Sequence, residues 1–242
     1  MIARWLMESR YTVIFTGAGM STESGVPDFR SSQGLWRGTH SQSLASVEAM
    51  EQDTGDFVSF YRSRIEALQH IQPHKGYAIL NTWAEKLHVK SIITQNTDFL
   101  HQKSANRNVI TLHGTIQQLH CRICKAKYPA EYYINEQIYC SCGGFIRPSV
   151  VLFGESLDHQ SLADAESESA QADLFIVLGS SLVVSPANLF PQIAKEHGAR
   201  LVIVNHDPTP LDSLADAVIH DTNIGDFLED ISLQTPVLHD ME

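Results

Sequence analysis

The sequence of 242 residues has few cysteines, few positive charges and no long hydrophobic run. No apolar stretch approaches the roughly 20 residues that a membrane-spanning helix requires, so we expect no membrane association. Seventeen lysines and arginines stand against 28 aspartates and glutamates, and the net charge of −11 argues against direct binding of nucleic acid. The apolar N-terminal segment ends at Met7, too early for a signal peptide, and we therefore expect a cytoplasmic protein.

The four cysteines lie close together in the sequence. Cys121-x-x-Cys124 is followed by Cys140-x-Cys142. In a reducing compartment such a cluster favours metal ligation over disulfides, and four thiolates make a closed tetrahedral zinc site with no position open for a substrate. We therefore predict a structural Zn²⁺ held by these residues, with four reduced cysteines and no metal as the alternative.

Short β-branched runs alternate with helical patterns along the chain. The apolar runs occur at residues 11–15, 91–93, 109–112, 174–178, 201–204 and 217–219. Between them apolar residues recur at helical spacing, as at Phe57, Tyr61, Ile65 and Leu68. The alternation predicts an α/β fold with a doubly wound, Rossmann-like parallel sheet, which binds ligands beyond the carboxyl ends of its strands.

Two segments interrupt this alternation. One is helical in pattern, and the other is rich in cysteine, tyrosine and glycine. We assign residues 1–33, 73–116 and 147–231 to the Rossmann-like domain, 34–72 to a helical insertion, 117–146 to a small zinc-binding module and 232–242 to a loosely ordered tail.

Polar and glycine-rich segments follow five of the six predicted strands. They are residues 16–19, 94–98, 113–115, 179–181 and 205–207. Because the carboxyl ends of parallel strands meet at one edge of the sheet, these segments are expected to line a single rim.

The first of these segments has the pattern of a dinucleotide cradle. Gly17-Ala18-Gly19 follows a strand and Ser21 stands where a helix N-cap is expected, so that backbone N–H groups would face a diphosphate. The same Gly-x-Gly pattern also serves as an ordinary tight turn. Thr22 replaces the third glycine of the hydride-transfer fingerprint, and no acidic residue follows at the usual spacing, which disfavours a dehydrogenase.

Longer motifs resemble those of the sirtuins, in the same order and over nearly the whole chain. They are GAGMSTESGVPDFR at 17–30, GLW at 34–36, TQNTDFLH at 94–101, LHG at 112–114, the cysteine pairs, FGE at 153–155, GSSL at 179–182 and VN at 204–205. Several motifs in one order are far more specific than any one of them. The Cys140-x-Cys142 spacing departs from the family, where two residues usually separate the second pair.

The resemblance implies an NAD-dependent protein lysine deacetylase, which transfers the acyl group from lysine to ADP-ribose and releases nicotinamide. It makes His113 the general base that acts on the ribose, with Asn96 and Asp98 as the other catalytic residues. The implied NAD contacts are Gly17, Ala18, Gly19, Ser21, Thr22, Asp28, Phe29, Arg30, Trp36, Gln95, Asn96, Asp98, His113, Gly179, Ser180, Ser181, Asn205, His206 and Asp207.

The implied partners are acyl-lysine proteins or peptides. In the family, the stretch that holds Val151, Phe153 and Gly154 binds the peptide backbone as an added strand. Tyr61-x-x-Arg64 resembles the pair that recognises acidic acyl groups in the desuccinylase branch, because a phenol and a guanidinium bind a carboxylate well. Tyr61 also continues an apolar stripe, and Thr22 and Asp28 resemble the deacetylase branch. We therefore favour deacetylation and keep acidic acyl groups as a second activity.

Two other functions would use the same residues. A mono-ADP-ribosyltransferase would cleave the same cofactor and pass the sugar to a protein side chain. A non-catalytic NAD or ADP-ribose sensor would bind the nucleotide without chemistry, although the presence of His113 and of the Asn96 and Asp98 pair disfavours it. A thiol redox protein is the least favoured alternative, because no Cys-x-x-Cys opens a helix after a strand.

Overall fold

A computed structural model describes residues 1–29, 34 and 43–238 of the chain. Its main sheet has six parallel strands in the order β3-β2-β1-β7-β8-β9. Their bounds are β1 (Thr12–Thr16), β2 (Val89–Thr94), β3 (Val109–Thr111), β7 (Leu174–Leu178), β8 (Arg200–Val204) and β9 (Ala217–Ile219). The chain order reverses between β1 and β7, the switch point at which such sheets bind ligands. The predicted doubly wound parallel sheet is confirmed.

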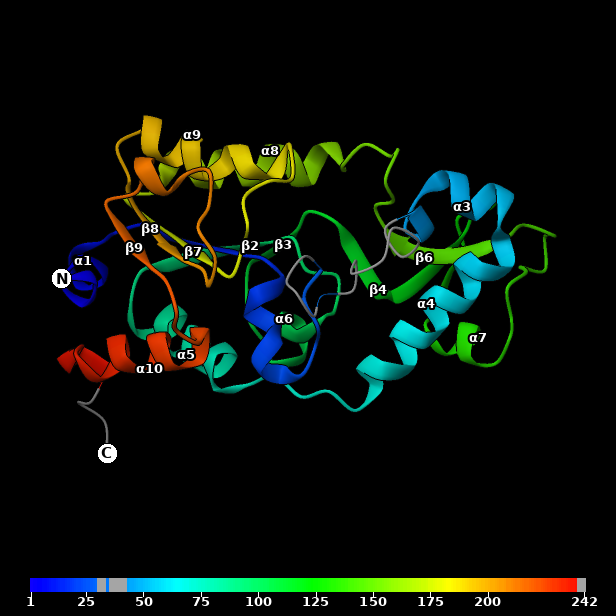
Figure 1. Cartoon of the computed structure of the whole chain (residues 1–242), viewed down its shortest axis with the longest axis horizontal. Coiled ribbons are helices and arrows are strands. Elements are labelled where there is room, and N and C mark those ends of the chain that lie inside the picture. The colour runs from blue at the N-terminus through cyan, green and yellow to red at the C-terminus, as the bar shows by residue number, and fades with distance from the viewer. Residues whose placement is uncertain (30–33, 35–42, 239–242) are drawn as a thin grey trace.

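Helices cover both faces of this sheet (Figure 1). On one face lie α1 (Ile2–Glu8), α5 (Lys75–Lys86), α6 (Leu100–Lys103) and α10 (Ile224–Leu233), and on the other lie α8 (His159–Gln171) and α9 (Phe190–Glu196). This double cover buries every residue of β1 and β7, whereas the edge strands β3 and β9 are only half-buried. Within the described ranges, every helix is too short or too polar to traverse a bilayer.

A smaller unit lies beside the main sheet (Figure 1). It contains an antiparallel sheet of β4 (Gly114–Cys121), β5 (Lys127–Pro129) and β6 (Ile146–Val150), with β4 in the middle. Helices α3 (Val47–Gln52), α4 (Thr54–Gln69) and α7 (Glu131–Ile134) pack on it around a core of their own, which includes Phe57, Tyr61 and Tyr133. The two predicted insertions thus share one core. The small sheet extends a few residues beyond both ends of the expected module at 117–146, and the other domain boundaries stay a prediction.

Two local features differ from the sequence-based expectation. Ser21 is not an N-cap, because a 3₁₀ helix already begins after Gly17, at η1 (Ala18–Ser24), and buries Ser21 within it. The segment from 232 to 238 is not loose, because α10 continues to Leu233 and a further turn, η4 (Pro236–Leu238), follows it. Thr235 between them is fully buried and donates a hydrogen bond to the Ile231 carbonyl at 2.8 Å.

Candidate active site

A cavity of about 1100 Å³ lies at the carboxyl ends of the central strands and extends to the smaller unit. Most of the residues that the sequence assigned to NAD or to the peptide line it. They are Gly17, Ala18, Gly19, Thr22, Asp28, Phe29, Tyr61, Arg64, Gln95, Asn96, His113, Val151, Phe153, Gly154, Gly179, Ser180, Ser181, Asn205, His206 and Asp207. Ser21 and Asp98 lie behind this wall, and Arg30 and Trp36 lie outside the described residues.

The glycines of the first turn allow the segments after β1 and β7 to touch. A Cβ on Gly17 would lie 2.6 Å from the Gly179 oxygen, and one on Gly19 would lie 2.7 Å from the Gly179 Cα. The Gly17 N–H donates to the Leu178 carbonyl at 3.1 Å, and the Gly19 N–H donates to that of Gly179 at 2.8 Å. These two N–H groups therefore join the two turns and do not face a diphosphate. Of the three residues, Ala18 alone keeps an N–H with no acceptor among the described residues, so it is the one that can bind a phosphate oxygen.

Ser21 connects Asn96 to Asp98 behind the cavity wall. Its hydroxyl donates to Asp98 Oδ2 at 2.6 Å and accepts from Asn96 Nδ2 at 3.1 Å. Asn96 Nδ2 also donates to the Gly17 carbonyl at 2.9 Å. Since the only Ser21 hydroxyl proton goes to Asp98, the Tyr77 hydroxyl at 2.9 Å must donate to Ser21. Burial and the neighbouring Asp98 raise the pKa of Tyr77 well above its usual value, so the phenol keeps this proton.

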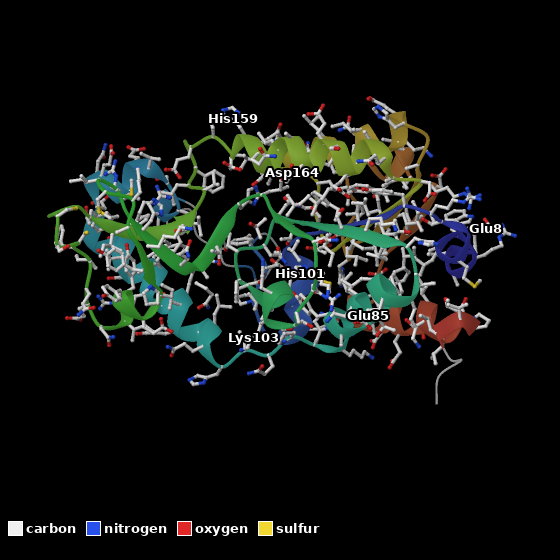
Figure 2. All side chains as sticks on the ribbon, turned by 180° about the vertical axis from the view of Figure 1, so that it is seen from behind. Glu8, Glu85, His101, Lys103, His159 and Asp164 are labelled. Carbon is white, nitrogen blue, oxygen red and sulfur yellow. The ribbon has the colours of Figure 1, made fainter. Side chains whose placement is uncertain are left out.

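A second buried polar layer supports the first, and it is built on His101, which lies in the interior of the main unit (Figure 2). The His101 ring contacts Thr16 Oγ1 through Nε2 at 3.0 Å and Asn106 Oδ1 through Nδ1 at 2.8 Å. Thr16 Oγ1 lies 2.8 Å from Thr94 Oγ1, which accepts the Asn96 N–H at 3.0 Å. Burial lowers the pKa of His101. This layer supports the Asn96 backbone through the hydrogen bond from the Asn96 N–H to Thr94 Oγ1.

His113 lies between β3 and β4 with its ring on the cavity wall. Its Nδ1 is 2.9 Å from the Gln95 carbonyl oxygen, which can only accept, so the neutral ring carries its proton on Nδ1 and its lone pair on Nε2. The next residue, Gly114, has φ +73°, and a Cβ there would overlap the Ser149 carbonyl. The backbone after His113 therefore requires glycine. The role of His113 as a general base stays a prediction.

The stretch after β6 lies beside His113 and lines the cavity. The Val151 N–H donates to the His113 carbonyl at 3.0 Å, and the Phe153 N–H donates to the Ala45 carbonyl at 2.9 Å. Within the described part of the chain, no hydrogen bond uses the Val151 carbonyl or the Gly154 N–H. The role of this stretch in binding a peptide stays a prediction.

Tyr61 and Arg64 reach the same cavity from α4, one helical turn apart. The Arg64 guanidinium lies 5.1 Å from the ring centre of Phe29 and 5.5 Å from that of Phe60. None of the ion pairs found in the described ranges involves Arg64, and its burial lowers its pKa. Burial raises the pKa of Tyr61 to about 12, so the phenol is neutral. The cavity wall therefore presents two groups side by side on α4: the Arg64 guanidinium, which packs on aromatic rings, and the Tyr61 hydroxyl, which can donate a hydrogen bond.

The four cysteines converge in the smaller unit. Their Sγ atoms all lie within 4.8 Å of one another, and the 121–142 and 124–140 pairs are each 3.5 Å apart. A tetrahedral zinc ion with four thiolates needs about 3.8 Å between sulfurs, close to these distances. The Cys142 backbone N–H and the Tyr128 hydroxyl lower the pKa of Cys140, whereas the neighbouring thiols raise that of Cys124, as expected for four sulfurs that compete for protons when no metal is bound. The cluster therefore fits a structural zinc ion.

Two glycines accommodate the short spacing of the second cysteine pair. Gly143 has φ +82° and donates its N–H to the Cys140 carbonyl at 2.9 Å. A Cβ on Gly144 would overlap the Cys121 sulfur. The tight turn thus brings Cys142 back to the other three sulfurs with one intervening residue instead of two.

The part of the cavity wall that follows β9 was not predicted from the sequence. Thr222, Asn223 and Ile224 line the cavity beside Asn205. A signal was present, because His220 begins a polar run directly after this strand, like the runs that follow the other five strands.

Comparison with known proteins agrees with this architecture. The model of the Sir2 family matches residues 17–186. The NAD-dependent protein deacetylase of Halalkalibacterium halodurans is 61% identical over 230 residues, which cover 95% of this chain and 97% of that protein. The NAD-dependent protein deacetylase of Shouchella clausii is also 61% identical, over 228 residues that cover 94% of this chain and 96% of that protein.

A solved structure shows the same fold. It is Sir2 in complex with the inhibitor EX-527, 2′-O-acetyl-ADP-ribose and a deacetylated p53 peptide, and it matches with a TM-score of 0.88 at 35% identity over 98% of both chains. The extent of the family match, the close relatives and the shared fold together show that this chain belongs to the Sir2 family, the sirtuins, as its motifs predicted.

Proposed function

We propose that this sirtuin is an NAD-dependent protein lysine deacetylase, which transfers the acyl group to ADP-ribose and releases nicotinamide. The observation that carries the proposal is that His113, the turn at Gly17 and Gly19, and the stretch after β6 all line one cavity. The names of the two close relatives support the activity. The 2′-O-acetyl-ADP-ribose bound to the similar Sir2 structure supports ADP-ribose as the acyl acceptor.

His113 is proposed as the general base. NAD, when bound, supplies the ribose carbon that loses nicotinamide and the neighbouring hydroxyl that receives the acyl group. The hydrogen bond from Nδ1 to the Gln95 carbonyl leaves the lone pair of a neutral ring on Nε2. That nitrogen can remove the proton from the ribose hydroxyl.

Asn96 is proposed to contact the nicotinamide half of NAD, with Asp98 acting through Ser21. Asp98 does not line the cavity, and its Oδ2 holds the Ser21 hydroxyl at 2.6 Å. Ser21 in turn accepts from the Asn96 amide, which fixes the orientation of that side chain before NAD binds. The adenosine half is assigned to Ser180 and Asn205, which line the same cavity.

The acyl-lysine peptide is proposed to bind beside Val151 and Gly154 as an added strand. Their unused carbonyl and N–H provide one acceptor and one donor for a peptide backbone. The Val151 N–H is bonded to the His113 carbonyl, so a peptide paired with this stretch is held in register with the proposed base.

The nucleotide product and a His113 variant test the main proposal together. We expect mass spectrometry to find acetyl-ADP-ribose after incubation with NAD and an acetyl-lysine peptide, and His113→Ala to abolish it without loss of zinc or of the folded state. Labelled ADP-ribose on a protein, without peptide turnover, would instead identify a mono-ADP-ribosyltransferase. NAD binding without nicotinamide release would identify a sensor.

A second activity, on acidic acyl groups, is supported by Tyr61 and Arg64. The Arg64 guanidinium lies over the Phe29 ring and is paired with no carboxylate of the described residues. A succinyl carboxylate can fill that role. We expect Tyr61→Phe and Arg64→Met to reduce succinyl-peptide turnover more than acetyl-peptide turnover. The control is Arg62→Met, on the same helix, because Arg62 pairs with Glu136 instead. Equal loss on both peptides would rule the activity out.

A further inference from the structure

Arg147 and Glu155 form a bidentate ion pair at the two ends of the segment that carries the peptide-binding stretch. Arg147 lies on β6 and is only 4% exposed. Its Nη1 lies 2.5 Å from Glu155 Oε1 and its Nη2 lies 3.0 Å from Oε2. Burial acts to raise the pKa of Glu155, but Arg147 and a backbone N–H outweigh it and hold that pKa below its usual value. The pair is therefore charged, and its two parallel hydrogen bonds fix its geometry.

The other hydrogen bonds of this pair go to the backbone between its two members. Arg147 donates through Nε to the Pro148 carbonyl at 3.1 Å and through Nη2 to the Val150 carbonyl. Glu155 Oε2 accepts the Leu152 N–H at 2.8 Å. Two side chains thus bind three peptide groups of the segment that they enclose. Their combined effect is to fix the path of the chain from the end of β6 to Glu155.

This path decides where the two unused backbone groups of the stretch point. The Val151 carbonyl belongs to the peptide unit whose N–H, on Leu152, is held by Glu155. A peptide unit is planar, so fixing its N–H also fixes the direction of its carbonyl. The Gly154 N–H lies one residue before Glu155, where the backbone has φ +95°. Among the described residues, Glu155 is the only side chain that hydrogen-bonds to the Val151–Leu152 peptide unit and so sets its rotation.

We propose that Arg147 and Glu155 are positioning residues for the acyl-lysine peptide. They act through the backbone of residues 150–154 and set the register of the peptide against His113. This inference rests on the proposed deacetylase function, because it assumes that the peptide pairs with this stretch. The inference goes further in naming what determines the backbone path of residues 150–154. That path is set by the Arg147–Glu155 ion pair and not by strand β6, which precedes it.

The test is Glu155→Gln, which keeps the size of the side chain and removes its charge. An amide offers one acceptor oxygen where the carboxylate offers two, so the Leu152 N–H or one guanidinium N–H loses its partner. We expect the KM for an acetyl-lysine peptide to rise about tenfold, as expected for the loss of one charged hydrogen bond. The KM for NAD and the kcat should change less than about twofold, because the nucleotide wall does not depend on this pair.

The matched control is Asp216→Asn, because Asp216 has the same kind of environment away from the cavity. It pairs with Lys195 at 2.6 Å and accepts the Leu201 N–H at 2.7 Å, and its side chain is 35% exposed against 32% for Glu155. A purely structural role for Glu155 would lower the fraction of active enzyme, and therefore kcat, to the same extent as in the control, with peptide KM unchanged. That result would overturn the proposal.

A binding measurement separates this proposal from the proposed function. The Kd of a fluorescent acetyl-lysine peptide, measured by anisotropy without NAD, should rise about tenfold in Glu155→Gln and stay constant in Asp216→Asn. If the wild-type protein binds the peptide without turning it over, the deacetylase proposal fails while this arm still tests the positioning role. Should Glu155→Gln fail to fold, Arg147→Lys keeps a charge pair without the fork and should shift Kd in the same direction. An unchanged Kd in a folded variant refutes the positioning role.

Discussion

Replacing Ser21 by alanine tests whether the buried polar network behind the cavity holds the proposed NAD site. The substitution deletes one oxygen that serves three partners, which are Asp98, Asn96 and Tyr77. Asp98 loses a donor at 2.6 Å and Tyr77 loses its acceptor, whereas Asn96 keeps its second bond to the Gly17 carbonyl. The damage is therefore greatest for the carboxylate and smallest for the amide.

The expected magnitudes follow from this ranking. A buried hydrogen bond to a carboxylate contributes about 2 kcal/mol and a neutral one about 1 kcal/mol, so Ser21→Ala should lower the free energy of unfolding by about 3 kcal/mol. Asn96 would lose one of the two partners of its amide nitrogen and keep the Gly17 carbonyl. A loss of about 1 kcal/mol at that position corresponds to a decrease of about fivefold in kcat/KM for NAD.

Urea unfolding and steady-state kinetics measure the two quantities, with Ser169→Ala as the control. Ser169 is as deeply buried as Ser21, but its hydroxyl donates only to the Ala165 carbonyl within α8, at 2.6 Å. Removing it should cost less than about 1 kcal/mol and leave the kinetics unchanged. If Ser21→Ala is no less stable than this control and uses NAD equally well, the reasoning on the network is wrong.

Three further predictions concern the zinc cluster, the glycine that follows His113, and the loss of folding stability at low pH. Metal analysis should find about one zinc per chain, and a strong chelator should lower the melting temperature of the smaller unit; a metal-free protein of equal stability would contradict the site. Gly114→Ala should lower the free energy of unfolding by at least about 2 kcal/mol and suppress turnover, because a Cβ there overlaps the Ser149 carbonyl. The control is Gly55→Ala within α4, where a Cβ meets open space, and this variant should be neutral or slightly stabilising. Burial acts to raise the pKa of Asp173, but hydrogen bonds, the largest from Ser9, hold it below its usual value. The Asp173 carboxylate therefore stabilises the folded protein above its unfolded pKa of about 3.9, and this stabilisation is lost as the pH falls through its pKa in the folded protein. The urea concentration at the midpoint of unfolding should accordingly decline less steeply below about pH 5 in Asp173→Asn than in the wild type.

The sheet could be predicted because its physical cause is local. Strands covered by helices on both faces must be apolar at every position, and β1 and β7 show this as uninterrupted runs in the sequence. The cysteine cluster could be predicted for a similar reason. Its four cysteines lie within one short segment of the chain, so they can reach a common metal ion. The polar ends of five strands indicated the rim, because parallel strands place those ends at one edge.

The features that the sequence did not reveal depend on residues that are distant in the chain. Ser21 looks like a helix cap in isolation, and its function as a hub exists only because Asp98, 77 residues later, folds against it. The packing of α4 on the cysteine module likewise joins Tyr61 to Tyr133 in one core, for which no local pattern exists. Glu155 was noted only as part of the FGE motif, and its ion pair with Arg147 carries no periodic signal in the sequence, so the pair could not be predicted.

The single hydrogen bond from the Val151 N–H to the His113 carbonyl has a consequence for altering substrate choice. It joins the peptide stretch to the proposed base, so mutations that reshape that stretch to admit a larger acyl group will also displace the base. Tyr61 and Arg64 come from α4, and among the described residues no backbone hydrogen bond joins them to His113 or to residues 151–154. Libraries aimed at new acyl groups should therefore vary α4 and leave residues 147–155 intact.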